Sequence, residues 1–518
     1  MGTGVEAEAP LILGVSGLRG IVGESLTPEV AVRYVASIGA WLEAGRGAAE
    51  GEPLAVVVAR DGRAGGSVFY HSAIGALLAS GCDVIPLDVA MTPTVAFAVD
   101  EFGADAGVIV TASHNPAEWN GLKVVASGDG EGGPTSVELG ACAPPATRAG
   151  ALVESFRAGR TDWVAPTLAG SVSPVASDAI AAHAETVVRL ASGVESSAAF
   201  DGLGNRRVVT DSVNASGGPA CRVFAEIAGL ELVQLGGDAS GVFPHTPEPT
   251  AANLSGAGGL CDVVPGAGAA VGFAQDPDAD RLAIVDERGA YIGEEYTPVL
   301  AAWSLLLERS SEGAGSPVIC VNLSTSRMID DVAAKFGAEV VRTAVGEANV
   351  VEAMKRLMSE GRDVVMGGEG NGGVIWPEVC FVRDSLSAMA LTLSLMARTG
   401  KTVSELVGEI DAMASGGKGY AIVKRKVEIP SKDAAAPAVE AVSKAYADQK
   451  IDRQDGVRVD WNEAPILSGV GGGGAAWLHV RASNTEPIMR LIAEAGTEAQ
   501  AGAILDAAAA AIGGGDGK

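Results

Sequence analysis

The sequence lacks the marks of several protein classes. Its six cysteines show no C-x-x-C spacing, so neither a zinc site nor a disulfide framework is predicted. Only 37 basic residues stand against 64 acidic ones, and the net charge of −27 disfavours a nucleic acid or an anionic membrane as partner. No apolar run is long enough to span a membrane, and the N-terminal segment is acidic where a secretory signal is basic. We therefore expect a cytoplasmic protein that holds any anionic ligand in a local pocket.

The chain has a regular alternation of strand-like and helix-like patterns. Its 518 residues are too many for one compact core, and a hydrophobic content of 47% excludes intrinsic disorder. The alternation occurs near residues 54–124, 206–286 and 317–376, and it is typical of α/β domains with crossover helices. After residues 414–419 the pattern changes to alternating strands with two helices, as in an α+β domain.

These patterns predict four domains. The expected fold is three similar mixed-sheet α/β domains around a cleft, followed by a C-terminal α+β domain with antiparallel strands. Each domain would contribute one polar loop that follows a strand, which is where ligands of open α/β sheets bind. The expected bounds of the four domains are residues 1–170, 171–292, 293–414 and 415–518.

Two of these loops suggest phosphate and metal chemistry. TASHNP, residues 111–116, exposes a serine after the apolar run AGVIV, although Ser, Asn and Pro are also ordinary turn residues. DPDADR, residues 276–281, places three carboxylates at alternate positions beside an arginine. Hard oxygen ligands of this kind suit Mg²⁺, whereas the alternative is a solvated acidic turn.

The other two loops suggest sugar and phosphate binding. GGEGNGG, residues 367–373, alternates a carboxylate and an amide between glycines, which could bind vicinal hydroxyls or form a flexible turn. RASNTEP, residues 481–487, combines a guanidinium with hydroxyl and amide groups. Such a set suits a phosphate dianion, and the alternative is the start of a helix.

Together with SGLRG near the N-terminus, the four loops resemble the motifs of the α-D-phosphohexomutase superfamily, in the same order and one in each predicted domain. The superfamily includes phosphoglucomutases, phosphomannomutases and phosphoglucosamine mutases. The resemblance spans nearly the whole chain and implies an intramolecular phosphotransferase. Pro277 and Val15 depart from the usual pattern, and RTAVGEANV lacks the histidine that some relatives use as a second acid or base. Glu347, a water molecule or Lys123 alone would then serve.

The resemblance implies a role for each matching residue. Ser113 would carry the transferable phosphoryl group as a phosphoserine, with His114 bonded to its loop, and Arg19 would lie near that group. Lys123 would transfer protons if neighbouring cations lower its pKa. The expected ligands of Mg²⁺ are the phosphorylated Ser113, Asp276, Asp278 and Asp280. The expected substrate-binding residues are Arg281, Glu369, Asn371, Arg481, Ser483, Asn484 and Thr485.

The implied reaction moves a phosphoryl group between the 1- and 6-positions of an aldohexose through a bisphosphate, with hexose 1,6-bisphosphate as activator. GEGNGG and RASNTEP are similar to the archaeal-type branch, which favours glucosamine 6-phosphate as substrate. A phosphoglucomutase/phosphomannomutase of broad specificity and a non-catalytic sugar-phosphate sensor are the alternatives. No G-x-S-x-G elbow supports a serine hydrolase. We expect a monomer or homodimer.

Overall fold

The computed structural model divides into two compact units. The first contains residues 1–297 and 372–403, and the second contains residues 298–371 and 404–518. No helix among the described residues has both the length and the apolar character that a membrane crossing needs. The described residues are 9–15, 17–45, 53–127, 140–193, 199–312, 316–414, 419–467, 470–483 and 487–513.

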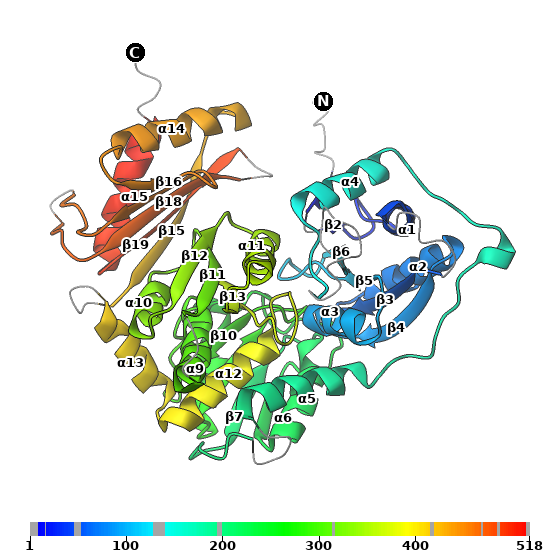
Figure 1. Cartoon of the computed structure of the whole chain (residues 1–518), viewed down its shortest axis with the longest axis horizontal. Coiled ribbons are helices and arrows are strands. Elements are labelled where there is room, and N and C mark those ends of the chain that lie inside the picture. Colours follow the sequence, from blue (N-terminus) through cyan, green and yellow to red (C-terminus); the bar gives the residue numbers. More distant parts are fainter. Residues whose placement is uncertain are drawn as a thin grey trace, which may run out of the picture. The chain divides into compact units, whose positions relative to one another are not determined.

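The first unit contains two sheets with their helices (Figure 1). The elements around the first sheet are β1 (Leu11–Gly14), β2 (Gly17–Ile21), α1 (Pro28–Gly45), β3 (Ala55–Arg60), α2 (Gly66–Ala79), β4 (Asp83–Val89), α3 (Thr92–Glu101), β5 (Ala106–Val110), β6 (Trp119–Ala126), α4 (Ala146–Arg157) and the 3₁₀ helix η2 (Pro166–Leu168). The others are α5 (Ala179–Ser192), β7 (Arg207–Asp211), α6 (Gly217–Ala228), β8 (Glu231–Leu235), α7 (Ala251–Leu254), α8 (Leu260–Gly266), β9 (Val271–Gln275), β10 (Leu282–Val285), β14 (Gly373–Ile375) and α12 (Ser385–Thr399).

The first sheet has the strand order β1-β2-β6-β5-β3-β4. β3 pairs in parallel with β4 and β5, whereas β6, β2 and β1 join in antiparallel pairs. The central strands are continuous apolar runs because helices cover both of their faces. α1 and α2 pack on one face, and Val95 and Val99 of α3 lie against Gly107 on the other.

Two cationic side chains share one face of this sheet. Arg19 of β2 lies opposite Gly121 of β6, and Lys123 is two residues further along β6. Successive side chains of a strand point to opposite faces, so Arg19 and Lys123 point the same way. A Cβ atom on Gly121 would lie 2.3 Å from the carbonyl oxygen of Leu18 and 2.8 Å from that of Thr111. The close approach of these strands therefore requires glycine at position 121.

The second sheet holds the loop that carries DPDADR. Its order is β10-β9-β7-β8, with β7 parallel to β8 and β9 and with β10 antiparallel to β9. Every residue of β9 and β10 is buried. The loop between them, residues 276–281, is called the aspartate loop below, and the buried strands fix both of its ends.

The second unit contains three parallel strands followed by an antiparallel sheet. β11 pairs in parallel with β12 and β13. The C-terminal sheet has the all-antiparallel order β15-β19-β18-β17-β16, and residues of α14 and α15 pack with it in one hydrophobic core. The elements are α9 (Tyr296–Glu312), β11 (Val318–Asn322), α10 (Met328–Lys335), β12 (Glu339–Thr343), α11 (Glu347–Ser359), β13 (Val364–Glu369), α13 (Val403–Met413), β15 (Ala421–Glu428), η3 (Lys432–Ala434), α14 (Ala435–Ala445), β16 (Lys450–Asp452), β17 (Val457–Trp461), β18 (Ala476–Ala482), β19 (Ile488–Ala495) and α15 (Glu498–Gly513). The predicted fold class is confirmed, while the bounds given for the four domains stay predictions.

A buried histidine links two parts of the second unit. His479 of β18 places Nδ1 2.9 Å from Ser324 Oγ and Nε2 2.7 Å from the carbonyl oxygen of Asp455. Because a carbonyl only accepts, Nε2 donates, and Nδ1 of the neutral ring accepts from the hydroxyl. Burial is the main cause that lowers the pKa of His479 to about 4.

We expect Gly121→Ala to destabilise the chain by about 1–3 kcal/mol, because the new methyl group overlaps two backbone oxygens that cannot move without displacing β2 or β5. Urea unfolding would measure the loss. Gly75→Ala in α2 is the matched control, because no atom lies within 4 Å of its added Cβ. The control should gain about 0.5–1 kcal/mol. Equal stability of wild type and Gly121→Ala would contradict the packing described here.

We expect the His479 ring to stay neutral in the folded chain down to about pH 5, because its pKa lies near 4. NMR of chain labelled with ¹³C at histidine Cε1 would follow the titration, with His479→Gln identifying the signal. The urea-unfolded chain is the control, because unfolded histidine titrates near about pH 6.5. The folded pKa lies below the unfolded one, so the neutral ring contributes stability above about pH 6.5 that is lost as the pH falls toward 4. A folded-state midpoint at the unfolded value would refute the expectation.

Candidate active site

The loop that carries Ser113 has a strained and tightly anchored backbone. Ser113 has a φ of +52°, in the left-handed region that non-glycine residues rarely adopt. Its N–H donates to Thr111 Oγ1 at 2.8 Å, and its carbonyl oxygen accepts from Nη2 of Arg63 at 2.6 Å. Asp61 accepts from both Thr111 Oγ1 and Arg63 Nε, and all four residues are buried. This anchoring fixes the direction of the serine hydroxyl.

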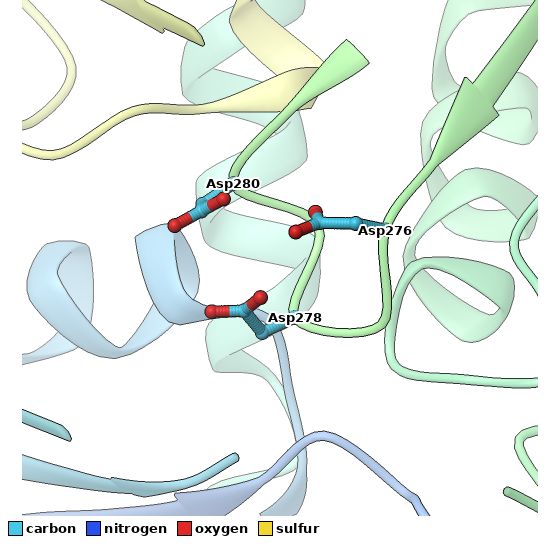
Figure 2. A group of neighbouring side chains, drawn as sticks. All are labelled: Asp276, Asp278 and Asp280. Atoms are coloured by element: carbon cyan, nitrogen blue, oxygen red, sulfur yellow. The ribbon is translucent and has the colours of Figure 1, made fainter. Parts of the chain in front are cut away.

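The serine hydroxyl points to the aspartate loop. Ser113 Oγ donates to Asp276 Oδ2 at 2.8 Å, across 163 residues of sequence. Asp276, Asp278 and Asp280 are buried, and a ligand oxygen from each lies within 4.8 Å of the others. Figure 2 shows the three carboxylates directed from the loop toward a common region. The structure therefore brings together the predicted serine and the three predicted metal ligands.

Two cationic side chains donate hydrogen bonds to the carboxylates, and a third, Arg281, has Nε 3.7 Å from Asp280 Oδ1. Lys123 Nζ donates to Asp278 Oδ2 at 2.5 Å and to Asp280 Oδ2 at 3.1 Å. Arg383, which precedes α12, donates from Nη2 to Asp280 Oδ2 at 2.6 Å. Thr92, the first residue of α3, donates its hydroxyl to Asp278 Oδ2 at 2.7 Å and its N–H to the Asp278 carbonyl oxygen at 3.0 Å. The Oδ2 atoms of both aspartates thus point to protein donors.

The remaining carboxylate oxygens fit a metal ion. Oδ1 of Asp278 and Oδ1 of Asp280 are buried and accept no hydrogen bond within the described part of the chain. A buried carboxylate oxygen without a donor is costly, so Asp278 Oδ1 calls for a cation, while Asp280 Oδ1 has Arg281 Nε at 3.7 Å. Hard anionic oxygens, one from each of three carboxylates within 4.8 Å, are the donors that Mg²⁺ and Ca²⁺ prefer. The aspartate loop could therefore hold a divalent metal ion.

The crowded charges shift the acidity of the three aspartates unequally. Burial and then the charges of Asp280 and Asp278 raise the pKa of Asp276 well above its usual value. Burial also raises the pKa of Asp280, but Arg383 and Lys123 outweigh it, so the net pKa lies well below its usual value. Asp276, the partner of the serine, is therefore the carboxylate that takes up a proton most readily.

The expectation that neighbouring cations lower the pKa of Lys123 is wrong in this arrangement. Burial lowers that pKa, and so do Arg19 and Arg383, but the charges of Asp278 and Asp280 raise it more. The net pKa lies above its usual value because two carboxylates contact the ammonium group directly. Lys123 is therefore held here as a cation and is a weak acid near neutral pH.

The other predicted residues of the serine loop lie around it. Arg19 donates from Nη1 to Asn115 Oδ1 at 3.0 Å, so it contacts the loop as expected. Burial, followed by Arg281 and Arg19, lowers the pKa of His114 to about 3, which keeps its ring neutral. Its Nδ1 has no hydrogen-bond partner among the described residues, so that atom does not make the expected bond to the loop. Arg281 donates its N–H to Asp276 Oδ1 at 3.3 Å.

The predicted sugar-binding residues belong to the second unit. Glu369 ends β13 and is buried. Asn322 Nδ2 donates to its Oε1 at 2.8 Å, and Asn371 Nδ2 donates to its Oε2 at 3.4 Å. Two amides from separate positions thus orient the carboxylate, and the expected contact of Glu369 and Asn371 with sugar hydroxyls stays a prediction.

The predicted phosphate receptor is only partly described. Arg481 of β18 forms an ion pair with Asp455, with Nε and Oδ2 3.0 Å apart. Ser483 follows β18, and its N–H donates to the Ile488 carbonyl oxygen at 2.9 Å. Asn484 and Thr485 lie outside the described residues. Arg481 is also directly opposite Arg490 of β19, a pairing of like charges that an anion would relieve.

Sequence reasoning missed Arg383, Thr92, Arg63 and Asp61. The only signal for the last two is DGR directly after an apolar strand run, and the signal for Arg383 is RDS before a helical pattern. Thr92 precedes a proline at the start of a helix, a pattern that predicts where the helix begins but gives Thr92 no functional role. Register and tertiary packing bring these residues to the site, so the local sequence patterns do not predict their contacts there.

Comparison with known proteins gives consistent results along the whole chain. Models of the phosphoglucomutase/phosphomannomutase family match in order, with alpha/beta/alpha domain I at residues 10–138, domain II at 186–289, domain III at 294–413 and the C-terminal domain at 422–511. A phosphoglucomutase/phosphomannomutase from Thermococcus kodakarensis is 33% identical, and a probable phosphoglucosamine mutase from Methanopyrus kandleri is 35% identical, each over 95% of this chain and 96% of its own.

A solved structure agrees at the level of the fold. The phosphoglucomutase/phosphomannomutase family protein from Burkholderia thailandensis superposes with a TM-score of 0.72 at 22% identity, over 97% of this chain and 98% of that one. The sequence matches show the family as well as the fold, because they span all four family domains and nearly the full length of the curated relatives. The chain belongs to the phosphoglucomutase/phosphomannomutase family, within the α-D-phosphohexomutase superfamily, and is a phosphomutase of the isomerase class.

Proposed function

We propose that the chain moves a phosphoryl group between the 1- and 6-positions of an aldohexose through a phosphoserine at Ser113 and a bisphosphate intermediate. The observation that carries the proposal is the 2.8 Å bond from Ser113 Oγ to Asp276 Oδ2 inside the buried aspartate cluster. A serine that served only as a turn residue would not need a strained backbone and an anchored hydroxyl beside three carboxylates.

In the proposed reaction the bond between phosphorus and Ser113 Oγ breaks as a bond forms to the free hydroxyl of a hexose monophosphate. The hydroxyl loses one proton and Ser113 Oγ regains one, so the step is balanced. The bisphosphate then returns its other phosphoryl group to Ser113, and hexose 1,6-bisphosphate activates the unphosphorylated chain. Catalysis of this kind depends on positioning and on charge stabilisation, which the anchored serine loop and Lys123 supply.

Asp276, Asp278 and Asp280 would hold Mg²⁺, with the phosphate of Ser113 as a further ligand. When bound, Mg²⁺ supplies the positive charge that stabilises phosphoryl oxygens during transfer. The Oδ1 atoms of Asp278 and Asp280, which accept no hydrogen bond from the described residues, support this assignment. Arg19, close to the serine loop through Asn115, would bind the phosphoryl group, and Arg281 would contact the substrate.

Proton transfer would fall to Lys123, with Glu347 or a water molecule as the partner base. The raised pKa of Lys123 keeps its side chain a cation and makes it a weak acid in this arrangement, so the partner base would take the proton of the substrate hydroxyl. Glu347 begins α11, in the segment where some relatives have a histidine.

In the second unit, Glu369 and Asn371 would read sugar hydroxyls, and Arg481, Ser483, Asn484 and Thr485 would bind the phosphate that is not transferred. We propose glucosamine 6-phosphate as the preferred substrate, supported by the 35% identity to the probable phosphoglucosamine mutase of Methanopyrus kandleri. The second candidate is a phosphoglucomutase/phosphomannomutase, which the 33% identity to the Thermococcus kodakarensis protein of that name supports.

We expect Asp278→Asn to lower the affinity for Mg²⁺ or Mn²⁺ by at least roughly 10-fold, because loss of a ligand should cost no less than loss of an outer-shell partner. Isothermal titration of the purified chain would measure it. Glu226→Gln, which neutralises an exposed acid on α6, is the matched control and should bind like wild type. Unchanged metal affinity in Asp278→Asn would remove the aspartate loop as the metal site.

We expect the wild type with Mg²⁺ and a trace of hexose 1,6-bisphosphate to interconvert hexose phosphates, and Ser113→Ala to turn over at least roughly 1,000-fold more slowly. Phosphorus NMR would follow glucosamine 6-phosphate, glucose 1-phosphate and mannose 1-phosphate in parallel. Ser72→Ala, whose hydroxyl only bonds within α2, is the matched control.

The relative rates of conversion identify the preferred substrate. Fastest conversion of glucosamine 6-phosphate supports the first candidate, and faster conversion of the other two supports the second. Binding of all three without turnover, equally in wild type and Ser113→Ala, would replace the mutase proposal with a sugar-phosphate sensor.

A further inference from the structure

The buried imidazole of His183 connects three helices of the first unit. His183 of α5 is fully buried, with Nδ1 3.0 Å from Thr94 Oγ1 of α3 and Nε2 3.2 Å from Asp384 Oδ2 just before α12. Its ring stacks on Phe97 of α3, with the ring centres 5.2 Å apart and the planes at 27°. These partners are 89 and 201 residues away from His183 in sequence, so the ring is a tertiary link.

The bonds of His183 are directional. An ionised carboxylate only accepts, so Nε2–H donates to Asp384, and Nδ1 shares its hydrogen bond with the Thr94 hydroxyl. Asp384 also caps α12, accepting from the N–H groups of Leu386 and Ser387 at 3.0 Å each. Thr94 is buried and Asp384 is only 1% exposed, so with the ring in place neither partner is open to solvent.

Both partners of His183 are next to groups that hold the aspartate loop. Arg383, adjacent to Asp384, donates to Asp280 Oδ2 at 2.6 Å. Thr92, two residues before Thr94, donates to Asp278 Oδ2 at 2.7 Å. The first turn of α3 and the start of α12 with the residue before its cap therefore each bond both to His183 and to the loop.

We propose that His183 is a positioning residue that sets the geometry of the aspartate loop through Thr92 and Arg383. It contacts neither the loop nor the reacting atoms. Fixing α3 against the α12 cap keeps the Oδ2 atoms of Asp278 and Asp280 on their protein donors and leaves the Oδ1 atoms without a hydrogen bond from the described residues. The inference rests on the metal role of this loop in the proposed function.

The test measures metal affinity rather than activity. Mn²⁺ is added to the full chain and free Mn²⁺ is counted by electron paramagnetic resonance. We expect His183→Leu to bind Mn²⁺ up to roughly 10-fold more weakly than wild type, the low end of the loss caused by removing a direct partner of a metal ligand, because His183 acts one residue further out. Thr94→Val, which keeps the volume and removes one bond of the imidazole, should weaken binding in the same direction, and it covers the case that His183→Leu fails to fold.

Ser394→Ala is the matched control. Ser394 is a buried residue of α12 whose hydroxyl donates to the Ala191 carbonyl oxygen of α5 at 2.7 Å, so it joins the same two helices away from the α12 cap. Its loss should lower thermal stability and leave Mn²⁺ affinity unchanged. Equal weakening in Ser394→Ala would mean that His183 acts only through helix packing and would overturn the proposal.

A double-mutant cycle tests the route. If His183 acts through Arg383, then His183→Leu should weaken Mn²⁺ binding less in a chain that already carries Arg383→Met than in wild type. Wild-type affinity in both His183→Leu and Thr94→Val overturns the inference and leaves the proposed function intact. Failure of the wild type to bind Mn²⁺ at all overturns the metal role in the proposed function, and the inference with it.

Discussion

Three carboxylates share one buried space at the end of β9, and their mutual repulsion is the constraint that the first unit is built to meet. Asp276, Asp278 and Asp280 offer oxygens within 4.8 Å of one another, where water cannot screen them. Lys123 and Arg383 offset part of this charge by direct ion pairs. The protein carries a net charge of −27, so these cations must be placed locally.

The balancing groups arrive on elements that are distant in sequence. Lys123 comes from β6, Arg383 from the segment before α12, and Thr92 from the N-terminus of α3, where free N–H groups and the helix dipole favour a carboxylate. The register of β6 against β2 and β5 fixes Lys123, and Gly121 allows these strands to approach. A slip of one residue would send Lys123 to the opposite face. The site therefore depends on the sheet as much as on its own loop.

The fold class and the centre of the site could be predicted from the sequence because both rest on local patterns. Alternating apolar runs and helical segments give the sheets, and DPDADR carries its three carboxylates at fixed spacing. Arg383 and His183 could not be predicted, because only the packing of α3, α5 and α12 gives them their partners. The expectation of a lowered Lys123 pKa was wrong for the same reason, because that pKa depends on which charges lie nearest in space.

Each carboxylate has two oxygens, so one loop can form ion pairs with cationic side chains of the protein and still offer oxygen atoms to a metal ion. Asp278 and Asp280 direct Oδ2 to donors of the chain, and their Oδ1 atoms accept no hydrogen bond from the described residues. Lys123 and Arg383 therefore stabilise the loop without using the atoms that a metal ion needs. The same pairing limits Lys123: an ammonium group held by two carboxylates is a weak acid near neutral pH and, while protonated, cannot accept a proton.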